Sequence, residues 1–371
     1  AMGIHVRIYP MIDVATEPRW SRIQDLFSED ANKVADIALA YLKGSRGENG
    51  GPAIISEFKH FPGGGAAPAG KDPHVKEGSV YTFPGNNFEY HLIPWKAVIN
   101  AGARRIMPYY YVNAKYNPNV AQSFSSEVLT DLLRNELGYD GIISSDWRAV
   151  SDRAYGVDTN IVNQKERYLM TFNAGMEDLA IGQKPELVKE LVEEGKLPIK
   201  KVKEVVSKLL EDKFTLGLFD NPYVDPQKAA EIVGSKEHRA ISMRAHREST
   251  VLLTNNNDLL PLEAGKVDAQ SGKIRCLKIF GYNLDTEVAD NYGIMVDDPD
   301  EADLAIICVE PFGQGDQANP GTLAFPRGTE AIINSVSKSG VPTILAVDFV
   351  RPGVIPSGVT DAVDAMFARF G

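Results

Sequence analysis

The chain has 371 residues, of which 43% are hydrophobic and 24% are charged, and its formal net charge is -11. This profile is typical of a soluble globular protein, and the length suggests two domains. The acidic balance argues against nucleic acid as a partner, because binding it requires concentrated Lys and Arg. The two cysteines are too few for a disulfide framework or a Cys-rich zinc site. No run is long and apolar enough for a membrane span.

Segments typical of strands and helices alternate through the first two thirds of the chain. The strand-like runs end near Pro10, Phe58, Tyr110, Asp146 and Ile181. Helical spacing of apolar residues predicts helices over 31–44, 88–102, 125–138, 165–175, 185–195 and 198–213. Pro94 is expected to break the second of these helices or to lie in its first turn. The alternation predicts a parallel sheet, and a closed (β/α)8 barrel would need three further strands before Ala1.

A turn-rich stretch at 213–227, KFTLGLFDNPYVDPQ, marks a boundary after these units. Beyond it lie the strand-like runs VLLTNN, KIRCLKIFG, ADLAIICVE and TILAVDF. A helical segment, GTEAIINSVSKSG, stands between the last two runs. This order predicts a second α/β unit.

Polar and aromatic side chains occur where the predicted strands end. In chain order they are Asp13, Arg19, Arg22, Lys59, His60, Met107, Tyr110, Asp146 and Trp147. Parallel strands end at one rim, where barrel enzymes keep their sites, so we expect these residues to lie together. Cations near Asp146 should lower its pKa and keep it ionised at neutral pH, which makes it a candidate nucleophile. The rings of Tyr110 and Trp147 would suit the apolar face of a sugar.

Each of these residues also has an ordinary explanation. A lone Asp after a strand is usually a turn or cap residue, and an isolated Trp usually packs in the core or at its rim. Only their joint occurrence at successive strand ends favours a site. The glycine cluster Gly63–Gly65 lacks the spacing of a dinucleotide or phosphate-binding loop, which disfavours a Rossmann-type dehydrogenase.

Four ordered motifs resemble blocks of glycoside hydrolase family 3. They are IYPMIDVATEPRWSRIQDLFSED, KHFPGGG, GYDGIISSDW and LLTNNNDLLPL. Further segments, among them GGGAAPAGKDPH and NNFEYHLIPWKAVINAGARRIMPYY, resemble its β-glucosidase-type branch. The family combines a (β/α)8 barrel with an α/β sandwich and hydrolyses β-linked glucosides, xylosides and related sugars with retention of configuration. The resemblance therefore implies an α/β protein with part of a (β/α)8 TIM-type barrel at 1–225, a linker at 226–245 and part of an α/β sandwich at 246–371.

The resemblance also implies roles for the residues at the rim. Asp146 matches the nucleophile that forms a covalent glycosyl-enzyme. Substrate-binding roles fall to Arg22, Lys59, His60, Met107, Tyr110 and Trp147. The expected substrate is a small oligosaccharide or β-glycoside, and we expect neither a metal nor a cofactor.

The acid/base residue is less directly indicated. A retaining glycosidase needs a second carboxyl about 5–5.5 Å from the nucleophile. In much of the family it is the second Glu of a block like V-x-E-x-P-Y-A-E-G-x-G-D in the sandwich domain. Here the segment ICVEPFGQGDQ places Gln314 at that position. Glu310 is our candidate acid/base, Asp316 is a further candidate, and loss of the acid is the alternative.

Both ends of the chain read as cuts, because the family's first barrel strands and the end of its sandwich have no counterpart here. We expect another segment or a partner chain to complete the barrel, since uncovered strand edges are rarely tolerated. No signal-peptide pattern is present, so periplasmic, secreted and cytoplasmic locations all stay open. The predicted function is a retaining, exo-acting β-glycosidase. The alternative is a carbohydrate-binding pseudoenzyme, or an acid-deficient relative, with the same pocket.

Overall fold

The computed structural model describes residues 2–47, 53–158, 160–180, 184–262 and 277–370. Its contacts divide the chain into two compact units. One comprises Ala1–Val233 with Asp316–Pro320, and the other comprises Gly234–Gly315 with Gly321–Gly371. The division falls within 226–245, where the structure has α6 (Pro226–Ile232) and the larger part of α7 (Lys236–Glu248). The linker assignment stays a prediction.

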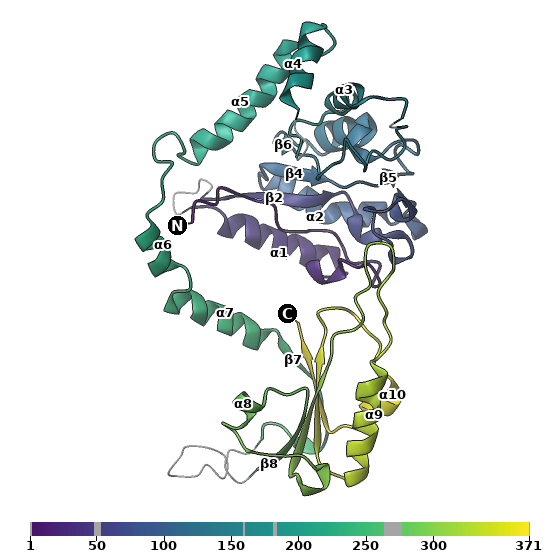
Figure 1. Cartoon of the computed structure of the whole chain (residues 1–371), viewed down its shortest axis with the longest axis vertical. Coiled ribbons are helices and arrows are strands. Elements are labelled where there is room, and N and C mark those ends of the chain that lie inside the picture. Colours follow the sequence, from purple (N-terminus) through teal and green to yellow (C-terminus); the bar gives the residue numbers. More distant parts are fainter. Residues whose placement is uncertain (1, 48–52, 159, 181–183, 263–276, 371) are drawn as a thin grey trace. The chain divides into compact units, whose positions relative to one another are not determined.

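The first unit is built on a parallel sheet (Figure 1). Among the described residues its strands follow the order β1 (Val6–Arg7), β2 (Ile55–Phe61), β4 (Arg105–Pro108) and β6 (Ile142–Ile143). A parallel bridge from Ser144 to Asp178 adds a fifth segment. These match the predicted strands, although the predicted end at Ile181 lies outside the described residues. Because all five run in one direction, their carboxyl ends share one edge.

Helices connect these strands as the alternation predicts. The connecting helices are α1 (Ala31–Gly44), α2 (Phe88–Asn100), a helix over Glu127–Glu136 and α3 (Gln164–Ala174), and α4 (Pro185–Glu193) and α5 (Ile199–Thr215) follow the last strand segment. The first begins at Asp30, whose carboxylate accepts the N–H groups of Asn32 and Lys33 as an N-cap. Two short strands, β3 (Val80–Tyr81) and β5 (Val112–Asn113), pair in parallel as a separate two-stranded sheet.

Pro94 contradicts its prediction, because it lies inside α2 without ending it. A proline within a helix costs about 3 kcal/mol, since it removes a backbone donor and crowds the preceding turn. Here Leu92, Trp95 and Val98 of the same helix are fully buried. The apolar surface that they bury offsets the cost of the proline.

A buried carboxylate links α5 to the amino end of the sheet, at the edge opposite to the strand ends. Asp212 is the one buried residue of α5. It accepts hydrogen bonds from Arg104 Nε at 2.7 Å and from Arg105 Nε at 3.1 Å. The second arginine also donates to Asp178 at 3.0 Å. This network holds the helix through charge, in addition to the packing of Val202 against the apolar core.

Asp212→Ala should therefore destabilise the first unit by about 2–4 kcal/mol, because it removes the buried counter-ion that two partly buried arginines share and leaves them only Glu211 and Asp178. Denaturant unfolding and hydrogen exchange in α5 measure the effect. The exposed pair of Lys200 and Glu204, 3.8 Å apart, supplies the control. Lys200→Ala should change stability by less than about 0.5 kcal/mol. Equal effects of the two variants would contradict this explanation.

The second unit is a layered α/β arrangement. Among the described residues its sheet has the order β7 (Thr250–Asn255), β12 (Ala365–Arg369), β11 (Thr343–Asp348), β10 (Leu304–Val309), β8 (Lys278–Tyr282) and β9 (Ile294–Val296). All neighbours are parallel except β7 and β12. In Figure 1, α9 (Arg327–Val336) and α10 (Ser357–Thr360) lie on one side of this sheet, and α8 (Thr286–Ala289) lies on the other. The predicted second α/β unit is confirmed.

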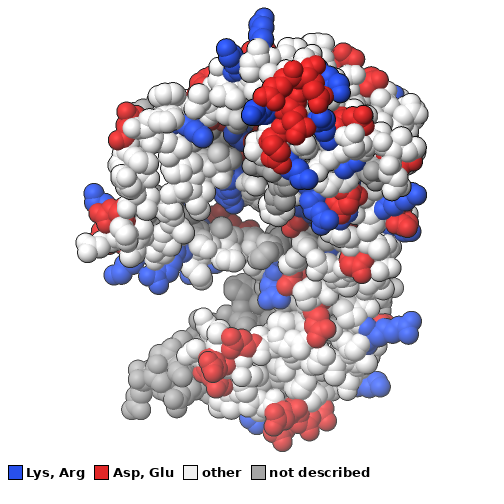
Figure 2. All heavy atoms as spheres, turned by 45° about the horizontal axis from the view of Figure 1, so that its top comes forward, with Lys and Arg blue, Asp and Glu red and all other residues white. Residues whose placement is uncertain are grey.

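Charges are mixed on the face drawn in Figure 2. Acidic and basic side chains are interspersed there, and the densest gathering is acidic. None of the helices in the described ranges has the length and hydropathy needed to cross a bilayer.

Candidate active site

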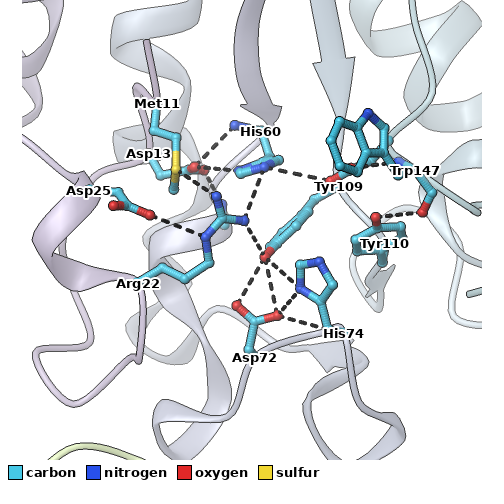
Figure 3. Close-up of polar contacts among 12 residues, drawn as sticks. Met11, Asp13, Arg22, Asp25, His60, Asp72, His74, Tyr109, Tyr110 and Trp147 are labelled. Atoms are coloured by element: carbon cyan, nitrogen blue, oxygen red, sulfur yellow. Dashed lines mark hydrogen bonds and ion pairs between the residues drawn. The ribbon is translucent and has the colours of Figure 1, made fainter. Parts of the chain in front are cut away.

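The carboxyl ends of β2, β4 and β6 bring most of the predicted site residues together (Figure 3). Lys59 and His60 belong to β2, and Met107 belongs to β4. Tyr110 follows β4 closely, and Asp146 follows β6. The strand register explains the grouping, since Lys59 pairs with Met107 across the parallel ladder.

The carboxylate of Asp146 is recessed, with only 9% of the residue exposed. Its Oδ1 accepts the backbone N–H of Trp147 at 2.6 Å, and its Oδ2 lies 3.6 Å from Nε2 of His60. The phenol of Tyr110 donates to the carbonyl oxygen of Trp147 at 2.6 Å. The turn after β6 thus holds the carboxylate in one orientation.

The predicted lowering of the Asp146 pKa is wrong. Burial raises the pKa of this carboxyl above its ordinary value of 3.8. The N–H of Trp147, the phenol of Tyr110 and the charges of His74 and Arg22 lower the pKa, but by less than burial raises it. The sequence shows which cations are near Asp146, but it does not show how much water the fold removes.

The guanidinium of Arg22 contacts side chains from several segments of the rim. Its Nη1 donates to the phenol oxygen of Tyr109 at 3.0 Å and lies 3.3 Å from Nε2 of His60. Its Nη2 lies 3.0 Å from the sulfur of Met11, and its Nε lies 3.4 Å from a carboxylate oxygen of Asp25. A guanidinium can only donate hydrogen bonds, so Nε2 of His60 is an acceptor and the ring proton is on Nδ1.

Asp13 holds His60 from beneath the rim. Its side chain is fully buried and accepts three N–H groups, from His60 N at 3.0 Å, His60 Nδ1 at 3.1 Å and Gly64 N at 2.6 Å. Burial raises the pKa of Asp13 to about 7. Burial, together with the charges of Arg22 and Lys59, lowers the pKa of His60 well below its ordinary value. His60 is therefore a neutral ring in a fixed tautomer.

The sequence motifs gave no role to a second Asp–His pair, Asp72 and His74, which lies beside the same rim (Figure 3). Asp72 Oδ1 accepts the backbone N–H of His74 at 2.8 Å and is hydrogen-bonded to Nδ1 of its ring. The carboxylate also accepts Nε1–H of Trp20 at 2.8 Å and the phenol of Tyr109 at 3.0 Å. The His74 ring packs edge-on against Tyr110, with centroids 4.7 Å apart. The Asp-x-His spacing within KDPH is the signal that could have revealed this pair, because an Asp often binds the N–H two residues on.

The predicted substrate-binding residues Trp147, Met107 and Lys59 differ in exposure or in the charges around them. Trp147 is 51% exposed, so its ring is free to meet a ligand, whereas Met107 is 2% exposed. Burial and the charge of Arg22 lower the pKa of Lys59, while the charges of Asp146, Asp25 and Asp13 raise it. The ammonium of Lys59 thus lies in the field of the Asp146 carboxylate.

The two acid/base candidates fall in different units, because Asp316 is grouped with the first unit and Glu310 with the second. The loop of Asp316 reaches the first unit, where the N–H of Asp72 donates to the carbonyl oxygen of Gln317 at 3.0 Å. Glu310 is exposed directly after β10, and Gln314 belongs with it to the second unit. The Asp316 carboxylate accepts the N–H groups of Ala318 and Asn319, each at 2.8 Å, within its own loop. The role of Glu310 stays a prediction. Among the described residues, no group of three His, Cys, Asp or Glu side chains is placed to hold a metal ion.

Comparisons with known proteins agree with this arrangement of strands and motifs. The family model for the "Glycosyl hydrolase family 3 N terminal domain" matches residues 1–211. The chain is 39% identical to "Probable beta-glucosidase C" of Aspergillus flavus and 32% identical to "Periplasmic beta-glucosidase/beta-xylosidase" of Dickeya chrysanthemi. Each alignment covers 100% of this chain and 60% of the relative, so the chain spans about three fifths of their length.

Solved structures show the same fold. A β-glucosidase from Listeria innocua in complex with isofagomine superposes with a TM-score of 0.80 at 21% identity, covering 99% of this chain and 55% of the other. A β-glucosidase from Erythrobacter marinus gives a TM-score of 0.79 at 22% identity, covering 99% and 57%. This likeness confirms the predicted fold class, part of a barrel followed by an α/β sandwich. The chain belongs to glycosyl hydrolase family 3.

Proposed function

We propose that this chain carries the nucleophile of a retaining β-glycosidase that acts from chain ends on β-glucosides or related β-linked sugars. The observation that carries the proposal is the setting of Asp146. Its carboxylate is recessed at a strand end, oriented by the N–H of Trp147 and placed 3.6 Å from His60. The names of the reported relatives, "Probable beta-glucosidase C" and "Periplasmic beta-glucosidase/beta-xylosidase", support this substrate class.

In the proposed reaction, the groups around Asp146 bind the sugar, and Asp146 itself bonds to the anomeric carbon. Arg22 and Lys59 supply donors for sugar hydroxyls, and neutral His60 offers a fixed ring edge beside them. The carboxylate of Asp146 attacks the anomeric carbon and forms a glycosyl ester, while the bond from that carbon to the aglycone oxygen breaks and this oxygen takes a proton from the acid/base residue. Water then gives a proton back to the acid/base residue, attacks the same carbon and releases the carboxylate, so two inversions give net retention. The exposed ring of Trp147 would cover an apolar sugar face.

A panel of aryl β-glycosides tests the proposal in the intact protein. Turnover of aryl β-glucosides or β-xylosides, with the β-anomer as the first product in proton NMR, is the expected result. The α-anomer as first product would exclude a glycosyl-enzyme. Sugar binding without turnover of any aryl glycoside would instead favour the pseudoenzyme alternative.

The pH profile of kcat/KM should show an acid limb above pH 3.8, the ordinary pKa of this carboxyl. Asp146 must be ionised to attack, and burial raises its pKa, so protonation abolishes activity at a higher pH than for an exposed Asp. The profile is measured with a dinitrophenyl glycoside, whose departure needs little acid assistance. Circular dichroism at each pH separates inactivation from unfolding. An acid limb below pH 3.8 would contradict the buried setting of Asp146.

A further inference from the structure

We propose that Glu57 is a positioning residue of this active site, which acts as the counter-ion of Lys59 from one layer beneath the rim. The inference rests on the proposed function, because it concerns a cation that would bind the sugar there. Glu57 belongs to the same strand as Lys59 and His60, and only 3% of it is exposed. None of the steps of the proposed reaction uses this buried carboxyl.

Glu57 and Lys59 project from the same face of β2. Successive side chains of a strand point to opposite faces, so residues two apart share a face and lie about 6.6 Å apart along the strand. Phe58, between them, packs in the apolar core on the other face. Across the sheet, Glu57 pairs in register with Arg105, and Lys59 pairs with Met107. Glu57 and Arg105 therefore form a layer directly beneath the layer of Lys59 and Met107.

The Glu57 carboxylate is buried without a partner for one of its oxygens. Among the described residues, Oε1 of Glu57 has no hydrogen bond, and neither has the buried hydroxyl of Ser144. Arg105 is engaged elsewhere, since its Nε donates to Asp212 at 3.1 Å and its Nη1 donates to Asp178 at 3.0 Å. Buried polar groups usually have partners, so pairing within its own layer does not account for Glu57.

The acids near Lys59 are engaged by other groups. Burial and the charge of Arg22 lower the pKa of Lys59. The acids whose charges raise this pKa are Asp146, Asp25 and Asp13. Each of them pairs with either His60 or Arg22. The charge of Lys59 lowers the pKa of Glu57, so these two groups interact electrostatically, and Glu57 keeps one oxygen free of other partners.

Glu57 supplies its negative charge only above a raised pKa. Burial and the charge of Asp178 raise the pKa of Glu57 above its ordinary value of 4.5. The hydroxyl of Ser144 and the charges of Arg105 and Lys59 oppose this rise. Once ionised, the carboxylate lies one layer beneath the ammonium and favours the protonated form of Lys59. The ammonium then offers its three N–H donors to sugar hydroxyls.

Glu57→Gln in the intact protein tests the proposal, because the amide keeps the shape and removes the charge. The basic limb of kcat/KM on a dinitrophenyl glycoside should move to lower pH by about 0.5–1 unit, since Lys59 then loses its proton more easily. This substrate needs little acid assistance, so its basic limb reports the binding cation rather than the acid/base residue. Glu57→Asp keeps the charge and should restore most of the wild-type profile.

A second readout follows Lys59 without catalysis. Competitive acetylation across pH, read by tandem mass spectrometry, gives the midpoint at which the Lys59 amine becomes reactive. This midpoint should fall in Glu57→Gln as the basic limb does, and it should stay near that of wild type in Glu57→Asp. The two substitutions alter none of the other titratable and charged groups around the pair, which are Arg22, Asp13, Asp25, His60, Asp146, Arg105, Asp178 and Tyr139.

Three comparisons separate this role from a purely structural one. Asp178→Asn removes a negative charge from the same network and breaks the pair with Arg105, so it should lower the melting temperature but leave the limb in place. Glu57→Gln should not lower the melting temperature at neutral pH, because burial disfavours the charge that it removes. In a Lys59→Met background, where no ammonium titrates, Glu57→Gln should leave the pH profile unchanged.

An acetylation midpoint that stays in place in Glu57→Gln would overturn the inference, and so would an equal shift of the basic limb in the Lys59→Met background. A lower melting temperature of Glu57→Gln with unchanged kinetics would also overturn it, since the role would then be structural. A wild-type protein that turns over no aryl glycoside would contradict the proposed function. The acetylation midpoint would still decide whether Glu57 is the counter-ion of Lys59.

Discussion

Asp146→Ala is expected to lower kcat on aryl β-glycosides by at least about 10³-fold while the protein stays folded. The residue forms no part of the apolar core, so the loss should be in chemistry rather than in stability. The variant removes the group that bonds to the anomeric carbon, and its recessed position leaves a space beside His60. Steady-state kinetics with a thermal melt at the same pH measure both effects.

Azide should partly restore this variant. A small anion in the vacated space attacks the anomeric carbon once, so the product should be the α-glycosyl azide, of opposite configuration to the substrate. Asp146→Asn is the matched control, because it keeps the shape and fills the space, and it should respond less to azide. A β-glycosyl azide from Asp146→Ala, or activity within a few-fold of wild type, would contradict its role as nucleophile.

Asp13→Ala is expected to destabilise the first unit by about 3–5 kcal/mol, because it strands buried donors that the carboxylate now satisfies. These are the two N–H groups of His60 and the backbone N–H of Gly64. A cavity left in a fully buried site adds to the cost. Denaturant unfolding of the intact protein measures the loss, and a loss below about 1 kcal/mol would contradict the role of Asp13.

The variant Asp13→Asn keeps the shape of the side chain but removes its ability to ionise. The amide fills the same space but offers one acceptor fewer, so its cost should be about 1–3 kcal/mol. The folded-state pKa of Asp13, about 7, lies above its ordinary 3.8. The stabilisation from this group is therefore complete below about pH 3.8 and is lost as the pH rises through about 7. The gap in stability between wild type and Asp13→Asn should shrink over that interval, and a gap that widens would contradict the raised pKa.

Strand periodicity and four motifs were enough to predict the alternation of strands and helices in the first unit. They also indicated that Lys59, His60, Tyr110 and Asp146 would meet, because carboxyl ends of parallel strands share an edge. Pro94 was misplaced because the propensity of a single residue says little once its helix buries a large apolar face. Packing, which decides such cases, is a property of residues far apart in the sequence.

The chemistry of the site was less predictable than its location. The pKa of Asp146 is raised rather than lowered, because the degree of burial depends on the whole fold. Asp72 and His74 lie in a loop without periodicity, and Asp13 acts through backbone groups of another strand end. Such partners become visible only when atoms distant in sequence are placed within hydrogen-bond distance.

Trapping of the glycosyl-enzyme tests the central claim most directly. The intact protein is incubated with a dinitrophenyl fluoroglycoside of the sugar that it turns over best, digested, and mapped by tandem mass spectrometry. The account predicts a single fluoroglycosyl ester on Asp146, within GYDGIISSDW, formed at the rate at which activity is lost. An ester on any other carboxylate, or inactivation without a covalent sugar, would contradict it.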